Sequence, residues 1–319
     1  MIELKNNGKL NFVLYLHYNF EEVLTGGIIA YHYLAYQIAQ KGHNVYMFTE
    51  PHYKHKNIHS IKSWRTQRFI ENDSTGKEGE ARQWEAFFYY HDNTIAVYTQ
   101  DEYSNPLGIN NVARWMVYDP LDHIRETWGE NEYYFTYGDQ KRLRTGLDKV
   151  EGSLVAMDFH LDIFKNENNP NRKGFCHILH KHNTPQSHTF VQELNSTSLD
   201  DWKKKGVWEY MAKEFNQHEY FITYDQLSFW PQIAALCGCK VIVMNVLDNP
   251  QAYYPYSTTP EQYREENPLK KYGVAFGFED LQWAIDTQHL VRPHLEEMNR
   301  QNEETVDNFV KFWENQCNL

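Results

Sequence analysis

Polar residues follow a short apolar run in the second half of the chain. The run is Tyr220–Thr223, and Tyr224, Asp225 and Ser228 come directly after it. A helical pattern then covers Gln226 to Cys237, and Lys240–Met244 has the composition of a buried strand. In a parallel sheet the loop of such a unit lies at the carboxyl end of its first strand, beside the amino end of the helix. We therefore predict that Tyr224, Asp225 and Ser228 contact a phosphorylated ligand.

A second loop of this type contains a Gly-Gly pair. Gly26 and Gly27 stand between a buried-strand pattern at Asn11–His17 and a helix predicted over Ile28–Lys41, with a further strand at Asn44–Thr49. Because glycine has no side chain, the backbone N–H groups of the pair can approach a phosphate or a sugar. The pair is not the dinucleotide fingerprint G-x-G-x-x-G, so a nicotinamide site has little support. A tight strand-to-helix turn is the other interpretation.

Basic residues flank the strand predicted at Lys173–His180. Arg172 and Lys173 stand at its start and Lys181 follows its end. A diphosphate carries two negative charges that Arg or Lys side chains neutralise, so these three residues are candidates for binding a diphosphate ligand. The other interpretation is that they are linker charges, since Asp162–Arg172 has the composition of a linker.

The same strand, with the two residues that follow it, contains one cysteine and three histidines. Cys176, His180 and His182 would share a face of the strand, as a zinc site requires. His177 falls on the other face, and no nearby carboxylate or second cysteine pair completes a tetrahedral set. A metal ion is therefore not expected here.

An acidic pair, Asp101-Glu102, follows the strand-like run Asn93–Thr99. A carboxylate in a loop can act as the general base of a transfer reaction. We favour Asp101 or Glu102 because Asn105-Pro106 makes the loop rigid, while His17, Glu21 and Glu22 in the first loop remain other candidates. The chain has no Asp-x-Asp, no Gly-x-Ser-x-Gly and no P-loop sequence, so metal-dependent sugar transfer, serine hydrolysis and ATP hydrolysis have little support.

Composition limits the class of protein further. The formal charge of −12 disfavours broad nucleic-acid binding, because such a surface repels phosphate backbones. No window approaches the length of an apolar membrane span and no signal peptide opens the chain, so we expect a soluble cytoplasmic protein without an integral membrane segment. Four cysteines are too few and too unevenly spaced for a disulfide framework. The 23 tyrosines and 9 tryptophans suit sugar faces and nucleobases, or simply an aromatic core.

The alternation of strand and helix patterns indicates an α/β protein with two Rossmann-like parallel sheets. We predict two domains, at 1–165 and at 166–298, followed by a last helix at 299–319. Further predicted elements are strands at Tyr133–Thr136 and Ser153–Met157, a helix at Val112–Tyr118 and an amphipathic helix at Ser198–Phe215.

Several segments resemble the GT-B glycosyltransferases. Gly26–Thr49, with Gly42-His43-Asn44-Val45, is similar to their first unit, and Asp225 stands where many retaining members have the first Glu of a Glu-x7-Glu pair, with Ile233 at the second position. Asn105-Pro106-Leu107 with Val112-Ala113-Arg114-Trp115, and Arg172-Lys173-Gly174 with Lys181, resemble motifs of bacterial and viral members.

The resemblance implies a hexosyl- or pentosyltransferase that moves a sugar from a UDP- or GDP-type donor to a glycan acceptor. It also implies that 1–165 is the N-terminal acceptor-side domain, that 166–298 binds the nucleotide sugar, and that the helix at 299–319 packs back on the first domain. It implies no cofactor and no metal, with Asp101 or Glu102 as the catalytic base. The donor would contact Gly26, Gly27, Arg172, Lys173, Lys181, Tyr224, Asp225 and Ser228. Two alternatives remain open: a Rossmann-type sugar-nucleotide epimerase or oxidoreductase, and a non-catalytic carbohydrate-binding protein.

Overall fold

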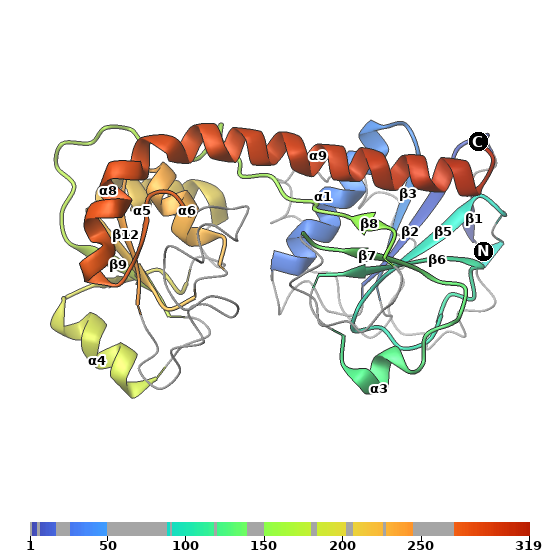
Figure 1. The fold of residues 1–319 in the computed structure, drawn as a ribbon, viewed down its shortest axis with the longest axis horizontal. Helices are drawn as coiled ribbons and strands as arrows, with labels where there is room; N and C mark the ends of the chain where they lie inside the picture. Colours follow the sequence, from blue (N-terminus) through green and yellow to red (C-terminus); the bar gives the residue numbers. More distant parts are fainter. Residues whose placement is uncertain are drawn as a thin grey trace. The chain divides into compact units, whose positions relative to one another are not determined.

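A computed structural model shows a mixed α/β chain with two parallel sheets and a long C-terminal helix (Figure 1). The structure describes residues 2–4, 7–16, 26–49, 88–89, 91–117, 120–138, 150–179, 184–201, 207–225, 228–244 and 271–319. The chain divides into two compact units, Met1–Asp158 with Arg300–Leu319, and Phe159–Asn299. Across the described ranges, no helix is long and apolar enough to cross a membrane.

The first unit is built on a sheet in which every neighbouring pair of strands is parallel, in the order β3-β2-β5-β6-β7-β8. Helix α1 (Gly26–Gln40) connects β2 to β3. A separate parallel pair joins β1 (Ile2–Glu3) to β4 (Phe88–Tyr89). The strands of the main sheet are β2 (Asn11–Leu16), β3 (Asn44–Thr49), β5 (Thr94–Thr99), β6 (Asn111–Met116), β7 (Tyr133–Thr136) and β8 (Gly152–Ser153).

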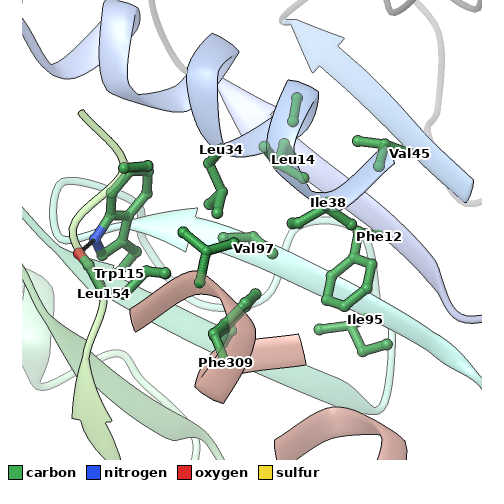
Figure 2. Packing of buried hydrophobic residues seen from close by; sticks show 14 of the residues in the cluster. Phe12, Leu14, Leu34, Ile38, Val45, Ile95, Val97, Trp115, Leu154 and Phe309 are labelled. Atoms are coloured by element: carbon green, nitrogen blue, oxygen red, sulfur yellow. Dashed lines mark hydrogen bonds between the residues drawn. The ribbon is translucent and has the colours of Figure 1, made fainter. Parts of the chain in front are cut away.

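Two helices supply the core on one face of this sheet (Figure 2). Leu34 and Ile38 of α1 lie over Phe12 and Val97 of the strands, and Phe309 of α9 (Val291–Gln316) packs into the same cluster. The middle of α9 also makes a polar contact with this unit, since Thr305 Oγ1 accepts from the Val155 N–H at 2.8 Å. The last part of the chain is therefore a component of the N-terminal core.

The second unit has a five-stranded parallel sheet in the order β10-β9-β11-β12-β13. Helices α4 (Pro185–Glu193) and α8 (Leu281–Thr287) cover the face that carries Ile222 and Ile242. On the opposite face, Phe215 of α5 (Val207–Gln217) packs on Phe221 with ring centroids 5.1 Å apart. The strands are β9 (Phe175–Ile178), β10 (Thr197–Ser198), β11 (Tyr220–Thr223), β12 (Lys240–Val243) and β13 (Val274–Phe276).

The helix predicted at Val112–Tyr118 is wrong. The segment is strand β6, paired with β5 on one side and β7 on the other. A central strand of a parallel sheet is buried on both faces and reads as a continuous apolar run. Arg114 interrupts that run, so the segment lacks the sequence pattern of a buried strand. The carboxylate that neutralises Arg114 is Glu132, which lies 18 residues further along the chain.

Two helix starts also differ from the prediction. The helix predicted from Gln226 is α6 (Trp230–Leu236), with Pro231 in its first turn, where a missing N–H costs no intrahelical hydrogen bond. The helix predicted over Ser198–Phe215 begins at Val207, and Ser198 belongs to β10. The segment interpreted as a linker is packed, since Phe164 is fully buried against Trp208.

Gly273 lies where α6 and α9 pack closely against the segment before β13. Its φ is +71°, and an added Cβ would lie 2.7 Å from Val291 Cγ2 and 2.9 Å from Ala235 Cβ. We expect Gly273→Ala to destabilise the protein by about 2 kcal/mol more than Gly108→Ala, because overpacking adds to the backbone strain that both share. Gly108 has a φ of +62° and open space around it, so it is the matched control. Urea unfolding of both variants measures the difference, and equal losses of stability would contradict the packing described here.

Candidate functional site

The carboxyl edge of the first sheet carries the loop between β5 and β6, which contains both predicted catalytic residues. Asp101 is partly buried, Glu102 is buried, and Tyr103 and Ser104 are exposed. Ser104 has a φ of 52°, a value that residues other than glycine seldom adopt and that persists only when neighbouring contacts hold it. The loop therefore needs strong anchors.

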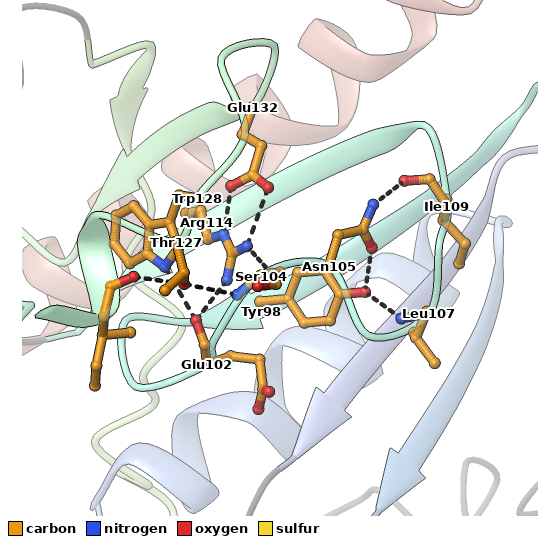
Figure 3. Close-up of polar contacts among 11 residues, drawn as sticks. Tyr98, Glu102, Ser104, Asn105, Leu107, Ile109, Arg114, Thr127, Trp128 and Glu132 are labelled. Atoms are coloured by element: carbon orange, nitrogen blue, oxygen red, sulfur yellow. Dashed lines mark hydrogen bonds and ion pairs between the residues drawn. The ribbon is translucent and has the colours of Figure 1, made fainter. Parts of the chain in front are cut away.

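Arg114 is the main anchor of this loop (Figure 3). Its guanidinium is fully buried and donates to the Glu102 carbonyl at 2.9 Å and to the Ser104 carbonyl. It also makes a two-point ion pair with Glu132, with Nε to Oε2 at 2.6 Å and Nη2 to Oε1 at 3.0 Å. A buried guanidinium is stable only with such a partner and with its remaining N–H groups satisfied. One residue of β6 thus fixes the backbone on both sides of Tyr103.

Aromatic side chains complete the support. The Arg114 guanidinium lies 4.8 Å from the centre of the Tyr98 ring and 4.9 Å from that of Trp128. Trp128 Nε1 donates to the Glu102 carbonyl at 3.0 Å, and the Tyr98 hydroxyl donates to Asn105 Oδ1 at 2.7 Å. The loop is therefore held on three sides by β5, β6 and the segment after α3 (Asp122–Arg125).

Asp101 has a defined side-chain position. Gln100 Nε2 donates to Asp101 Oδ2 at 2.7 Å, and Gln100 Oε1 accepts from the Val117 N–H at 3.0 Å. The second contact fixes the orientation of the amide, so its NH₂ group faces the carboxylate. Asp101 is therefore an oriented carboxylate at the carboxyl edge of a parallel sheet.

The Gly-Gly pair lies at the start of α1, in the same unit. Gly26 is exposed and Gly27 is partly buried. Further along this helix, Tyr31 stacks on Trp115 with ring centroids 5.0 Å apart. Burial raises the pKa of Tyr31 well above its usual value, Arg114 opposes this rise, and Glu102 and Asp101 add to it. The hydroxyl of Tyr31 therefore keeps its proton at neutral pH.

In the second unit, the predicted residues after β11 lie together at the carboxyl edge. The Asp225 N–H donates to Thr223 Oγ1 at 3.2 Å, and the Ser228 N–H donates to the Asp225 carbonyl at 3.3 Å. Ser228 Oγ in turn accepts from the Trp230 N–H at 3.3 Å. Tyr224 is partly buried, which raises the pKa of its hydroxyl. These contacts form a compact turn between the strand and α6.

Arg172 and Lys173 lie at the other edge of that sheet. Both precede β9, which runs parallel to β11, so they are separated from the turn at Asp225 by the length of the strands. Arg172 donates to the carbonyls of Phe215 and Cys237, at the ends of α5 and α6. A cation at the carboxyl ends of two helices satisfies free carbonyls and their negative partial charge. This placement argues against the predicted role of Arg172 and Lys173 in binding a donor at the carboxyl edge.

Several of the predicted candidates lie outside the described residues, among them His17, Glu21 and Glu22. Lys181 lies outside the described residues, as do His180 and His182. Cys176 is buried, and its thiol donates to the Tyr220 carbonyl at 3.4 Å. Within the described part of the chain, no group of three or more His, Cys, Asp and Glu side chains could hold a metal ion.

Sequence reasoning missed the role of the Arg114 and Glu132 pair. The only available signal was an arginine within the apolar segment Val112–Met116, because a charge that is buried in a strand must find a counter-charge. Nothing in the sequence identified Glu132 as that partner, since several other carboxylates lie at comparable separations.

No protein-family model matches the chain, and no curated protein matches its sequence. Among solved structures, the crystal structure of the glycotransferase of kitacinnamycin is similar, with a TM-score of 0.43 and 11% sequence identity over 97% of this chain and 98% of that one. At this identity and TM-score the likeness is distant.

Proposed function

We propose that this protein is a glycosyltransferase that moves a sugar from a nucleoside-diphosphate sugar to a glycan acceptor without a metal ion. The observation that carries the proposal is the path of the last helix. Residues Arg300–Leu319 belong to the N-terminal unit, although the preceding residues from Phe159 onward form the second unit. Two parallel α/β units and a C-terminal helix that returns to the first are what the GT-B resemblance implies.

We assign the catalytic role to the carboxyl edge of the first sheet, where Asp101 lies, and donor binding to the carboxyl edge of the second, where Asp225 lies. Asp101 accepts the proton of the acceptor hydroxyl while that oxygen attacks the anomeric carbon of the donor. The bond from the sugar to the diphosphate breaks, and the diphosphate leaves with the electron pair. Of the two candidate bases, Asp101 fits better because Glu102 is buried, with 6% of its surface exposed.

On the donor side, we assign Tyr224, Asp225 and Ser228 to contacts with the nucleotide or the sugar. Lys181 follows β9 in the sequence and would neutralise the charge that develops on the diphosphate. The assignment of a UDP- or GDP-type donor is part of the same proposal and follows from the GT-B resemblance.

We expect Asp101→Asn to lower the rate of sugar transfer about 100-fold, because the amide cannot accept the proton of the acceptor. The variant should keep the rise in melting temperature that UDP or GDP gives the unaltered protein, because the donor contacts lie in the second unit. Transfer is measured with a panel of UDP- and GDP-sugars and oligosaccharide acceptors, and donor binding is measured by thermal shift.

Asp92→Asn is the matched control, since Asp92 is an exposed aspartate just before β5, at the opposite end of that strand from Asp101. It should leave both readouts unchanged. Stabilisation by NAD(P) with none by UDP or GDP would favour the epimerase or oxidoreductase alternative. Equal transfer rates for the two variants would show that Asp101 is not the base.

A further inference from the structure

The second unit contains a cavity of about 320 Å³ beside the edge strand β10. It lies among β9, β10 and α4, and its lining residues are separate from those to which we assign sugar transfer. The polar side chains that matter most for its chemistry are those of His177, His188, Gln192, Ser196, Ser198 and Asp200.

His177 forms the inner wall of the cavity. It lies opposite Ser198 in the register of β9 and β10 and is 5% exposed. Its Nδ1 is 2.9 Å from Ser196 Oγ, which fixes the ring. Burial lowers the pKa of His177, Asp200 opposes this, and His188 adds to it. A neutral imidazole presents one donor and one acceptor nitrogen rather than a positive charge.

The other walls are also held in place before any ligand arrives. Asp200 Oδ1 accepts from the Leu179 N–H and Oδ2 accepts from Ser198 Oγ, both at 3.0 Å. On the helix side, Thr184 and Ser187 form a reciprocal capping box that fixes the start of α4, the helix that carries His188 and Gln192. A preformed site of this kind loses little conformational entropy when it binds.

The types of residue in the lining select the chemical class of the ligand. Two imidazoles, two hydroxyls, side-chain amides and one carboxylate supply both donors and acceptors. The described lining includes no Lys or Arg to neutralise a phosphate, no Phe, Tyr or Trp to stack on a nucleobase, and Val191 as its one apolar side chain. Such a set fits a neutral ligand with several hydroxyl groups.

We propose that this cavity binds a single neutral sugar residue, either as a free monosaccharide or as one unit of a glycan chain. The volume is near the lower end of the range for small-molecule sites, about 300–1,000 Å³. The proposal does not depend on sugar transfer, because a carbohydrate-binding protein without catalytic activity could use the same cavity.

The test is saturation-transfer NMR and calorimetry on the full chain, with methyl glycosides of glucose, galactose, mannose and N-acetylglucosamine and with a tetrasaccharide of each. We expect one sugar type to bind, and His188→Ala and Gln192→Ala each to weaken it about tenfold through the loss of hydrogen bonds. Equal affinity for the methyl glycoside and the tetrasaccharide identifies a free-sugar site, whereas tighter binding of the tetrasaccharide identifies a glycan site.

Gln186→Ala and Glu193→Ala are the controls, since both residues are exposed on α4 and lie outside the cavity lining. They should bind the sugar as the unaltered protein does. The proposal is overturned if no sugar binds, if all four variants bind alike, or if inorganic phosphate binds in place of sugar and His188→Ala removes that binding.

Discussion

Glu132→Gln is expected to lower the free energy of unfolding by about 3 kcal/mol or more, because it leaves the Arg114 charge buried without a counter-charge. Both side chains of this pair are nearly inaccessible, with 0% of Arg114 and 6% of Glu132 exposed. Solvent cannot replace the lost carboxylate, unlike at a surface ion pair, where the effect is about 0–1 kcal/mol. Urea unfolding at neutral pH measures the change.

Glu130→Gln is the control for this experiment, since Glu130 is exposed and only two positions away in the sequence. A loss of stability no larger than that of the control would mean that the two carbonyls and the two aromatic rings around Arg114 suffice to hold its charge. A second variant, Arg114→Met with Glu132→Met, should regain much of the stability, because an apolar pair of similar volume avoids the burial of charge.

The double variant also separates stability from function. Without Arg114, the carbonyls of Glu102 and Ser104 lose their donor, and the loop that carries Asp101 is no longer fixed from β6. We therefore expect the double variant to fold while its sugar-transfer activity stays low. This outcome would connect the buried ion pair to the acidic loop, and hence to the base that we propose.

Much of the fold could be predicted because buried parallel strands leave a simple pattern. Val45–Thr49 and Tyr220–Thr223 are continuous apolar or β-branched runs, and strands β3 and β11 have the predicted limits, Asn44–Thr49 and Tyr220–Thr223. Gly42 and Gly238 mark the helix ends, with φ values of 92° and 98° that other residues adopt only with strain. In these segments the local composition alone predicts the strand, because the strand does not depend on a polar contact with a distant residue.

The rest could not be predicted because it depends on contacts between distant segments. Arg172 illustrates this limit, since its local sequence suits a phosphate clamp as well as it suits a cap for two helix ends. Only the fold brings the carbonyls of Phe215 and Cys237 to the guanidinium. Arg114 is a second example. Its charge within an apolar segment led to the prediction of a helix where the structure has β6, the strand that positions the candidate site.

A buried histidine of α1 should make the protein sensitive to mild acid. His32 is 3% exposed, and burial lowers its pKa from 6.5 to about 3. The folded state thus resists the proton that the unfolded chain takes up below pH 6.5, so stability decreases as pH falls from 6.5 towards 3. At pH 4.5 this amounts to about 3 kcal/mol relative to neutral pH, from about 1.4 kcal/mol per pH unit.

We expect His32→Leu to flatten the dependence of unfolding free energy on pH between 4.5 and 6.5 by about one proton, because leucine does not titrate. His43→Gln provides the comparison. Burial also lowers the pKa of His43, but Glu314, whose Oε1 is 3.3 Å from Nε2, opposes the shift, so that variant should change the slope less. Urea unfolding at several pH values gives both slopes. If His32→Leu kept the full slope, the acid sensitivity would come from other groups, and His32 would have to accept its proton within the folded protein.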